Sequence, residues 1–167
     1  MNSSKAKGVF NVVCKNADGS IAWSSQFQNG TTDEGRAYMH EAAFRAGTQD
    51  TIWYIGLISS SSYSALSTLD TSASHSGWVE NTAYSESTRR QWDAGSPVSS
   101  AGTTTVTSGT PAVFTASAST SVKGAFLSSA SAKNATTGVL WATGVFISDQ
   151  SLNVGQTLSI TYQTSLT

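Results

Sequence analysis

The second half of the chain divides into short apolar runs separated by turn residues. The last run alternates strictly, with Leu158, Ile160 and Tyr162 on one side and hydroxyl or amide residues between them. Such alternation is typical of a strand with one packed and one solvated face. Further strands are expected over residues 112–116, 121–128 and 139–147. Short strands at this spacing predict a mainly β fold, an antiparallel sandwich or barrel. Of these two, we expect the β-sandwich, of jelly-roll-like form.

The first part of the chain predicts a β-hairpin followed by one short α-helix. Residues 9–14 and 21–27 read as strands, and Asp18-Gly19 supplies the positive φ that a tight turn requires. Thr31 or Thr32 is the expected N-cap, and good helix formers continue to Arg45. The expected apolar face of the helix comprises Ala37, Met39, Ala42, Ala43 and Phe44.

We expect one β-rich domain over all 167 residues, a length sufficient for a substantial core. Within it, residues 1–7 are expected to form a flexible arm, residues 8–47 the hairpin plus helix, and residues 48–167 the sandwich. The sequence shows no repeat of fixed period, and nothing in it indicates a second domain.

Residues 51–92 combine a buried strand with a long polar excursion that is rich in aromatic residues. The apolar run 52–58 predicts the strand, and Trp78 and Trp92 follow among serines and threonines. Large aromatic side chains in such an excursion need a packing partner, which is either the rest of the domain or another chain.

The low charge of the chain gives no support for nucleic acid or an anionic membrane as partner. Charged residues make up only 11% of the chain and the formal net charge is -1, so there is no electrostatic reason to expect nucleic acid or an anionic membrane as partner. Cys14 is the one cysteine and is expected to be a small core residue. No apolar run resembles a signal peptide or a membrane span, so we expect a soluble chain made in a cytoplasm.

Groups that could perform catalysis are scarce. His40-Glu41 begins like the zinc-protease helix motif, but Phe44 stands where the second histidine belongs. Asp70, His75 and nearby serines resemble a catalytic triad only in composition, because no nucleophile elbow accompanies them. We expect His40 to be an exposed helix residue and His75 to bond to backbone. The prediction is a protein without enzymatic activity, metal or cofactor.

The residues that could instead contact a partner lie in the aromatic excursion. Arginine and tryptophan are enriched at binding hot spots. Arg89 and Arg90 have an equally good alternative, in which one pairs with Glu80 or Glu86 and the other is solvated. Trp78, Trp92 and Trp141 could also line a sugar-binding platform, although core packing is the commoner use of tryptophan. The predicted contact residues are Trp78, Tyr84, Arg89, Arg90 and Trp92.

The order of several motifs resembles a family of small, uncharacterised structural proteins of tailed bacteriophages and prophages. The resemblance covers nearly everything after about Thr48. It rests on the segments 53–58, 70–80, 122–127, 138–142 and 155–162, together with Tyr84, Arg89, Arg90 and Trp92.

The resemblance implies a virion structural protein, and a capsid cement (decoration) protein is the first choice among such proteins. Its partners would be the major capsid protein and further copies of itself. It would be located on the capsid surface, and in the host cytoplasm during assembly. Two alternatives remain open: a tail or head–tail connector component, and a carbohydrate-binding module of a tail fibre.

Overall fold

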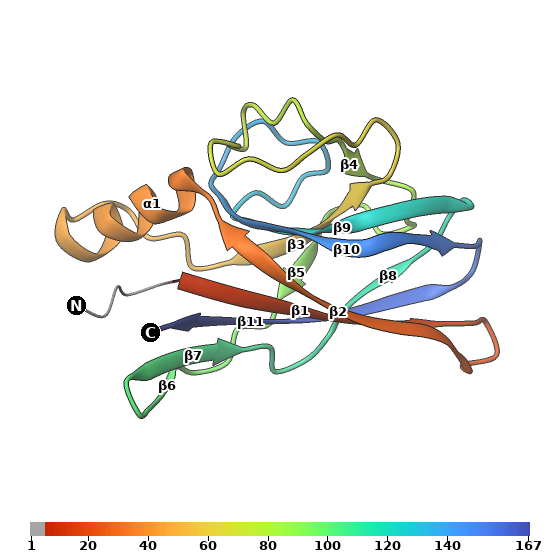
Figure 1. The fold of residues 1–167 in the computed structure, drawn as a ribbon, viewed down its shortest axis with the longest axis horizontal. Helices are drawn as coiled ribbons and strands as arrows, with labels where there is room; N and C mark the ends of the chain where they lie inside the picture. The colour runs from red at the N-terminus through yellow and green to blue at the C-terminus, as the bar shows by residue number, and fades with distance from the viewer. Residues whose placement is uncertain (1–5) are drawn as a thin grey trace.

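The computed structural model describes residues 6–167 and consists of β-strands with one α-helix (Figure 1). The first elements are β1 (Ala6–Lys15), β2 (Ile21–Thr31), α1 (Asp33–Phe44) and β3 (Trp53–Ser59). Four short strands follow: β4 (Glu80–Asn81), β5 (Arg90–Trp92), β6 (Val98–Ser100) and β7 (Thr103–Thr107). The last are β8 (Ala112–Thr115), β9 (Thr120–Ser128), β10 (Leu140–Leu152) and β11 (Thr157–Leu166). The helix of 12 residues is too short to cross a membrane, and among the described residues no other helix could do so.

All strands join one antiparallel sheet in the order β4-β3-β9-β10-β2-β1-β11-β7-β6, with β5 also paired to β3 and β8 also paired to β11. Isolated bridges between Tyr84 and Ala116 and between Ala94 and Ser108 link the segments after β4 and β5 to the segments after β8 and β7. The sheet therefore curls around one interior. The predicted mainly β, antiparallel fold with one short helix is confirmed, and the arrangement is consistent with the predicted sandwich.

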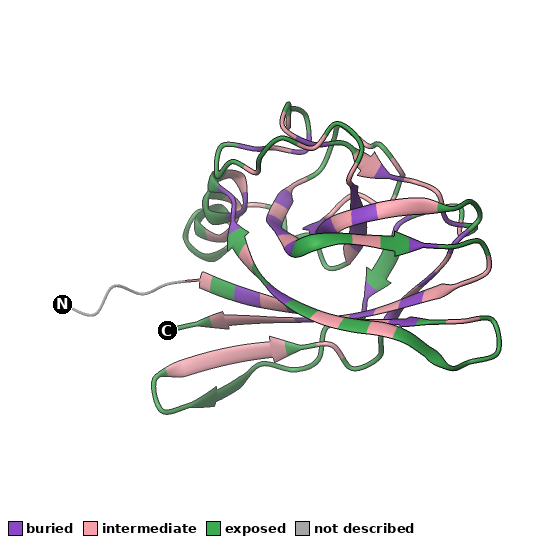
Figure 2. Ribbon diagram, turned by 45° about the vertical axis from the view of Figure 1, so that its right-hand side comes forward, coloured by how far each residue is buried: buried purple, intermediate pink, exposed green. Residues whose placement is uncertain are grey.

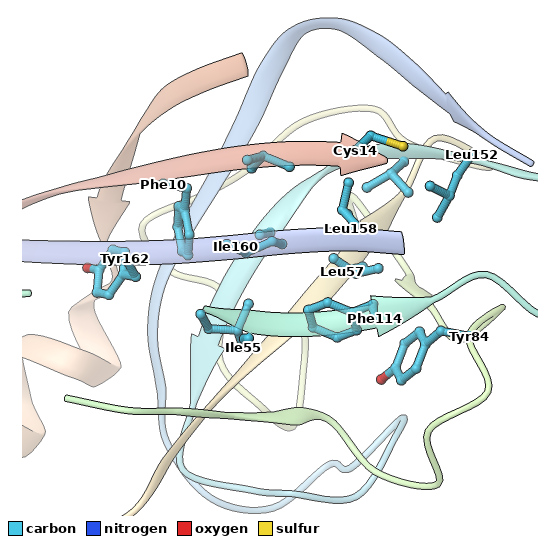
Figure 3. Close-up of a cluster of buried hydrophobic side chains, with 14 of the residues drawn as sticks. Phe10, Cys14, Ile55, Leu57, Tyr84, Phe114, Leu152, Leu158, Ile160 and Tyr162 are labelled. Carbon is cyan, nitrogen blue, oxygen red and sulfur yellow. The ribbon is translucent and has the colours of Figure 1, made fainter. Parts of the chain in front are cut away.

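The inner face of the sheet forms the main core (Figure 3). Leu158, Ile160 and Tyr162 of β11 are at most 1% exposed, which confirms the face predicted from their alternation. Phe10 packs on Tyr162 with ring centroids 4.5 Å apart. Cys14 is also in this core, as expected, and burial raises the pKa of its thiol. A second, smaller cluster of buried residues comprises Ile58, Trp78, Phe126 and Leu140.

The N-terminal hairpin is part of the same sheet. Gly19 has a φ of 85°, as the Asp18-Gly19 turn predicted. β1 pairs with β2 on one side and with β11 on the other, and its register places Ala6 opposite Leu166 and Lys7 opposite Ser165. The predicted arm is therefore wrong for residues 6 and 7, because backbone pairing fixes them in a strand. Residues 1–5 of that arm lie outside the described residues.

Helix α1 contacts the sheet mainly at its first turn. Thr32 is the N-cap and its hydroxyl accepts from the Gly35 backbone N–H at 3.0 Å. Gly35 lies so close to β10 that a Cβ there would stand 2.6 Å from the Trp141 carbonyl oxygen. The far end of α1 projects beyond the sheet (Figure 1). Phe44 is consequently 79% exposed, and its predicted place on a packed face is wrong.

Candidate functional site: an aromatic groove beside the helix

A groove of about 420 Å³ lies between α1 and the adjoining end of the sheet. Such a volume falls in the range of small-molecule sites. Its apolar lining includes Tyr38, Met39, Trp53, Trp92, Leu127 and Trp141, and these six residues define the aromatic groove. They come from α1, β3, β5, β9 and β10, so the groove depends on the complete fold.

The tryptophans of the aromatic groove are held by the register of the sheet. β3 and β5 place Trp53 opposite Trp92. Trp53 and Trp141 meet edge to face with centroids 6.0 Å apart, and Tyr38 of the helix lies 5.4 Å from Trp53. The Tyr38 hydroxyl accepts from the Asp50 backbone N–H at 2.5 Å, which ties the segment after α1 to the helix. Trp53 and Trp141 remain only half-buried, so their rings are available from solvent.

The groove carries almost no charge. Asp50 is the only acidic residue among those that line it, and no lysine, arginine or histidine lines it. This favours an uncharged occupant, because a buried ion without a partner is costly.

Buried polar side chains lie next to the groove. The Tyr162 hydroxyl and both polar atoms of the Asn29 carboxamide are buried. Burial raises the pKa of Tyr162 to about 12, and hydrogen bonds with Thr164, Trp141 and Asn29 lower it by smaller amounts. Thr164 and Trp141 line the groove, so the hydroxyl stands next to its wall.

Most of the predicted contact residues lie in the interior. Trp78 is 2% exposed, Tyr84 3%, Arg89 4% and Trp92 8%. Only Arg90 is exposed, at the start of β5, in a polar cleft between β5 and β8. The prediction of a contact role is therefore wrong for the four buried side chains, since the folded chain does not present them to a partner. For Arg90 it stays a prediction.

Arg89 and Arg90 follow the alternative in which one is paired and one is solvated. The Arg89 guanidinium donates from Nε and Nη2 to the two Glu80 carboxylate oxygens at 3.0 and 2.9 Å. It also donates to Ser128 and to the Ala130 carbonyl oxygen, and lies 4.8 Å from the Phe126 ring centroid. All three nitrogens of this buried guanidinium thus donate to acceptors within the chain, which explains its burial.

Trp78 is likewise buried with its polar group hydrogen-bonded within the chain. Its indole N–H donates to Asp70 at 3.0 Å, and the His75 ring stacks on it at 3.9 Å. His75 Nδ1 bonds to the Trp78 carbonyl oxygen at 3.1 Å, which confirms the expected bond to backbone. Asp70 therefore serves Trp78 and not His75, so the triad-like set does not assemble.

The predicted sugar platform does not assemble either. Trp78 belongs to the smaller cluster around Phe126, whereas Trp92 and Trp141 belong to the aromatic groove. His40 is exposed on α1, as expected. Among residues 6–167, no group of three His, Cys, Asp or Glu residues is placed to hold a metal ion.

Sequence reasoning missed Trp53, Asn29 and Tyr162 as site residues. A signal existed for Asn29, which occupies an inner-face position two residues after Phe27, where an apolar residue is expected. Nothing in the sequence pattern marks Trp53, because its partial exposure follows from the position of α1.

Comparison of the chain with protein-family models, with curated proteins and with solved structures found no match.

Proposed function

We propose that this chain is a non-enzymatic structural protein of a bacteriophage particle, in first place a capsid cement protein that binds the major capsid protein. The proposal rests on the sequence resemblance together with one structural feature, an open strand edge at β6. A cement protein works through repeated modest contacts whose multivalency makes the assembly strong. It needs surfaces that can adhere to another chain.

The β6–β7 hairpin provides such a surface. β6 ends the sheet, and among the described strands only β7 pairs with it. All three of its residues are exposed, and Val98 is 62% exposed (Figure 2). An exposed edge of this kind can accept a strand of another protein by β-augmentation.

The register of the hairpin shows which backbone groups of β6 could pair with an added strand. Ala101 and Gly102 both have positive φ, 48° and 80°, and join Ser100 to Thr103 in a two-residue turn. In such a hairpin the Ser100–Thr103 pair is hydrogen-bonded and the next pair, Ser99–Thr104, is not. The Ser99 backbone N–H and C=O therefore point away from β7, toward any added strand.

The test uses shells of the major capsid protein encoded by the same genome. Ser99→Pro removes the outward N–H while leaving the β7 pairing in place. Ser99→Ala is the matched control, because it removes the hydroxyl and keeps the N–H. We expect wild type and Ser99→Ala to co-sediment with the shells, and Ser99→Pro to need at least about tenfold more protein for half-saturation. Wild-type protein that stays in the supernatant would contradict the proposal.

A further inference from the structure

Helix α1 is packed at its beginning and largely uncovered at its end. Gly35 in the first turn lies against β10, whereas the far end of the helix projects beyond the sheet (Figure 1). A helix of 12 residues is marginal in water without tertiary packing. The aromatic groove lies along the second half of α1, and Met39, Ala42 and Ala43 form part of its wall. On this side the helix is therefore left with open space where a packing partner is expected.

Phe44 is the only aromatic residue among the exposed large hydrophobic side chains of the described chain, at 79% exposure. Successive residues of a helix are about 100° apart, so Phe44 points away from the helix face that Met39 and Ala42 present to the groove. Its ring lies 5.7 Å from the ring of His40, which is itself exposed. Phe44 thus presents an apolar ring to a neighbouring molecule and does not fill the groove of its own chain.

The charges at this end of the molecule are complementary. Arg45 directly follows Phe44, its side chain is 75% exposed, and it lies 3.5 Å from the exposed Glu41. Asp50 is the only charged residue that lines the groove, and its carboxylate forms no ion pair within residues 6–167. A Phe44 ring that entered the groove from another copy would bring Arg45 close to Asp50. Such a pairing of opposite charges helps to fix the orientation of two partners.

We propose that the aromatic groove is occupied by a second copy of this chain, which inserts its Phe44 ring and places its Arg45 beside Asp50. The ring enters from solvent, onto the partly exposed Trp53 and Trp141, and the contact between these two tryptophans stays as it is. The groove of about 420 Å³ is large enough, because about 150 Å³ suffices for a benzene ring. One chain carries both the projecting ring and the groove, so the contact is self-complementary.

A second copy explains two features at once. It covers the open groove and it removes the exposed Phe44 ring from water, whereas any other occupant of the groove would leave that ring in solvent. The formal net charge of -1 also produces little repulsion between copies. The inference concerns the isolated protein and does not depend on the proposed role in a virion.

Sedimentation velocity over a wide range of protein concentrations measures this association. We expect wild type to be monomeric when dilute and to form dimers as the concentration rises. Phe44→Ser should weaken dimerisation at least about tenfold, because the burial of a phenylalanine ring is lost. Ile147→Ser is the matched control, since Ile147 is fully exposed and lies about 20 Å along β10 from Trp141. This control should dimerise like wild type.

A second variant blocks the groove and keeps the inserted ring. Ala43 is exposed and lines the groove, so Ala43→Glu adds bulk and charge there while retaining a good helix former. Alone, it should also dimerise at least about tenfold more weakly than wild type. An equimolar mixture of Ala43→Glu and Phe44→Ser should associate more tightly than either variant alone, because one intact ring then meets one intact groove. Damage to the fold would give no such recovery.

Three results would overturn the inference. They are a wild type that stays monomeric at every concentration, equal dimerisation of wild type and Phe44→Ser, and a mixture of the two variants that associates no better than each alone. A monomeric wild type together with loss of shell binding by Ala43→Glu would assign the groove to the capsid protein instead. Failure of wild type to bind shells would contradict the proposed function and leave the dimerisation result unaffected.

Discussion

Two aromatic regions of this molecule differ in how completely they are closed. The cluster around Trp78 is sealed by polar bonds: Asp70 accepts from its indole, and the Glu80–Arg89 ion pair lies beside Phe126. The aromatic groove has comparable ring content, but Trp53 and Trp141 stay half-buried and α1 contacts the sheet mainly at its first turn.

The difference shows that aromatic content does not by itself indicate a binding surface. In the long excursion, carboxylates supplied from nearby in the chain satisfy the polar edges of tryptophan and arginine, so these side chains can be buried. At the α1 end the helix leaves the rings of Trp53 and Trp141 only partly covered, and the neighbouring apolar surface stays accessible. The extent to which the rings are covered distinguishes the closed region from the open one.

The largest expected effect on stability comes from breaking the Glu80–Arg89 ion pair of the closed region. Glu80→Ala leaves the Arg89 guanidinium buried without its carboxylate, and Asn134 loses the acceptor of its backbone N–H. We expect the free energy of unfolding to fall by about 4 kcal/mol, measured by urea denaturation. Arg90→Ala, at an exposed position, is the control and should change it by less than about 0.5 kcal/mol. Equal effects of the two variants would contradict the comparison.

A smaller effect is expected from alkaline titration beside the groove. Burial raises the pKa of Tyr162 to about 12, above the value of about 10 for an unfolded tyrosine. The unfolded chain therefore loses this proton first, so the contribution is complete below about pH 10 and is lost as the pH rises to about 12. The loss amounts to about 3 kcal/mol.

Urea denaturation of wild type and Tyr162→Phe at several pH values between about 9 and 12 tests whether stability falls as the pH rises. The variant should lose stability less steeply, because it has no phenol to ionise at this position. Parallel curves for the two proteins would show that Tyr162 does not remain protonated in the folded state.

The third prediction concerns the acceptor of the Trp78 indole. Asp70→Ala leaves two donors without an acceptor, the indole N–H and the Ser67 backbone N–H. We expect a loss of about 2 kcal/mol in the free energy of unfolding and a changed near-ultraviolet circular dichroism spectrum. Asp149→Ala, which breaks the surface pair with Lys123, should leave both nearly unchanged. An unaltered spectrum for Asp70→Ala would mean that the Trp78 environment does not depend on this bond.

The smallest effect is expected at the open region. Phe44 is 79% exposed at the end of α1, so Phe44→Ser should alter the free energy of unfolding by less than about 0.5 kcal/mol. A loss above about 1.5 kcal/mol, typical of a buried aromatic residue, would show that the end of α1 packs more closely than described.

Local patterns were sufficient to predict most of the fold. The alternation of Leu158, Ile160 and Tyr162, the Asp18-Gly19 turn and the threonine cap of α1 depend on neighbours in the sequence, and each is confirmed. Phe44 was predicted wrongly, because helical periodicity gives the face of a side chain but does not say where the sheet ends.

The site was predicted less well, since burial depends on distant partners. The sequence offered two alternatives for the two arginines, and only the fold shows that Glu80 reaches Arg89 and leaves Arg90 exposed. Trp53 became a candidate only when β3, β10 and α1 were seen to meet around it. Spacing along the chain carries no information about such a meeting point.

The most direct test of the proposed function is the copy number of this chain in virus particles produced from the genome that encodes it. Purified particles are digested, and peptides of this chain and of the major capsid protein are quantified against labelled standards. A capsid cement protein predicts a number of copies that approaches the number of coat subunits. A few copies per particle would indicate a tail or connector component instead, and complete absence from the particles would contradict the account.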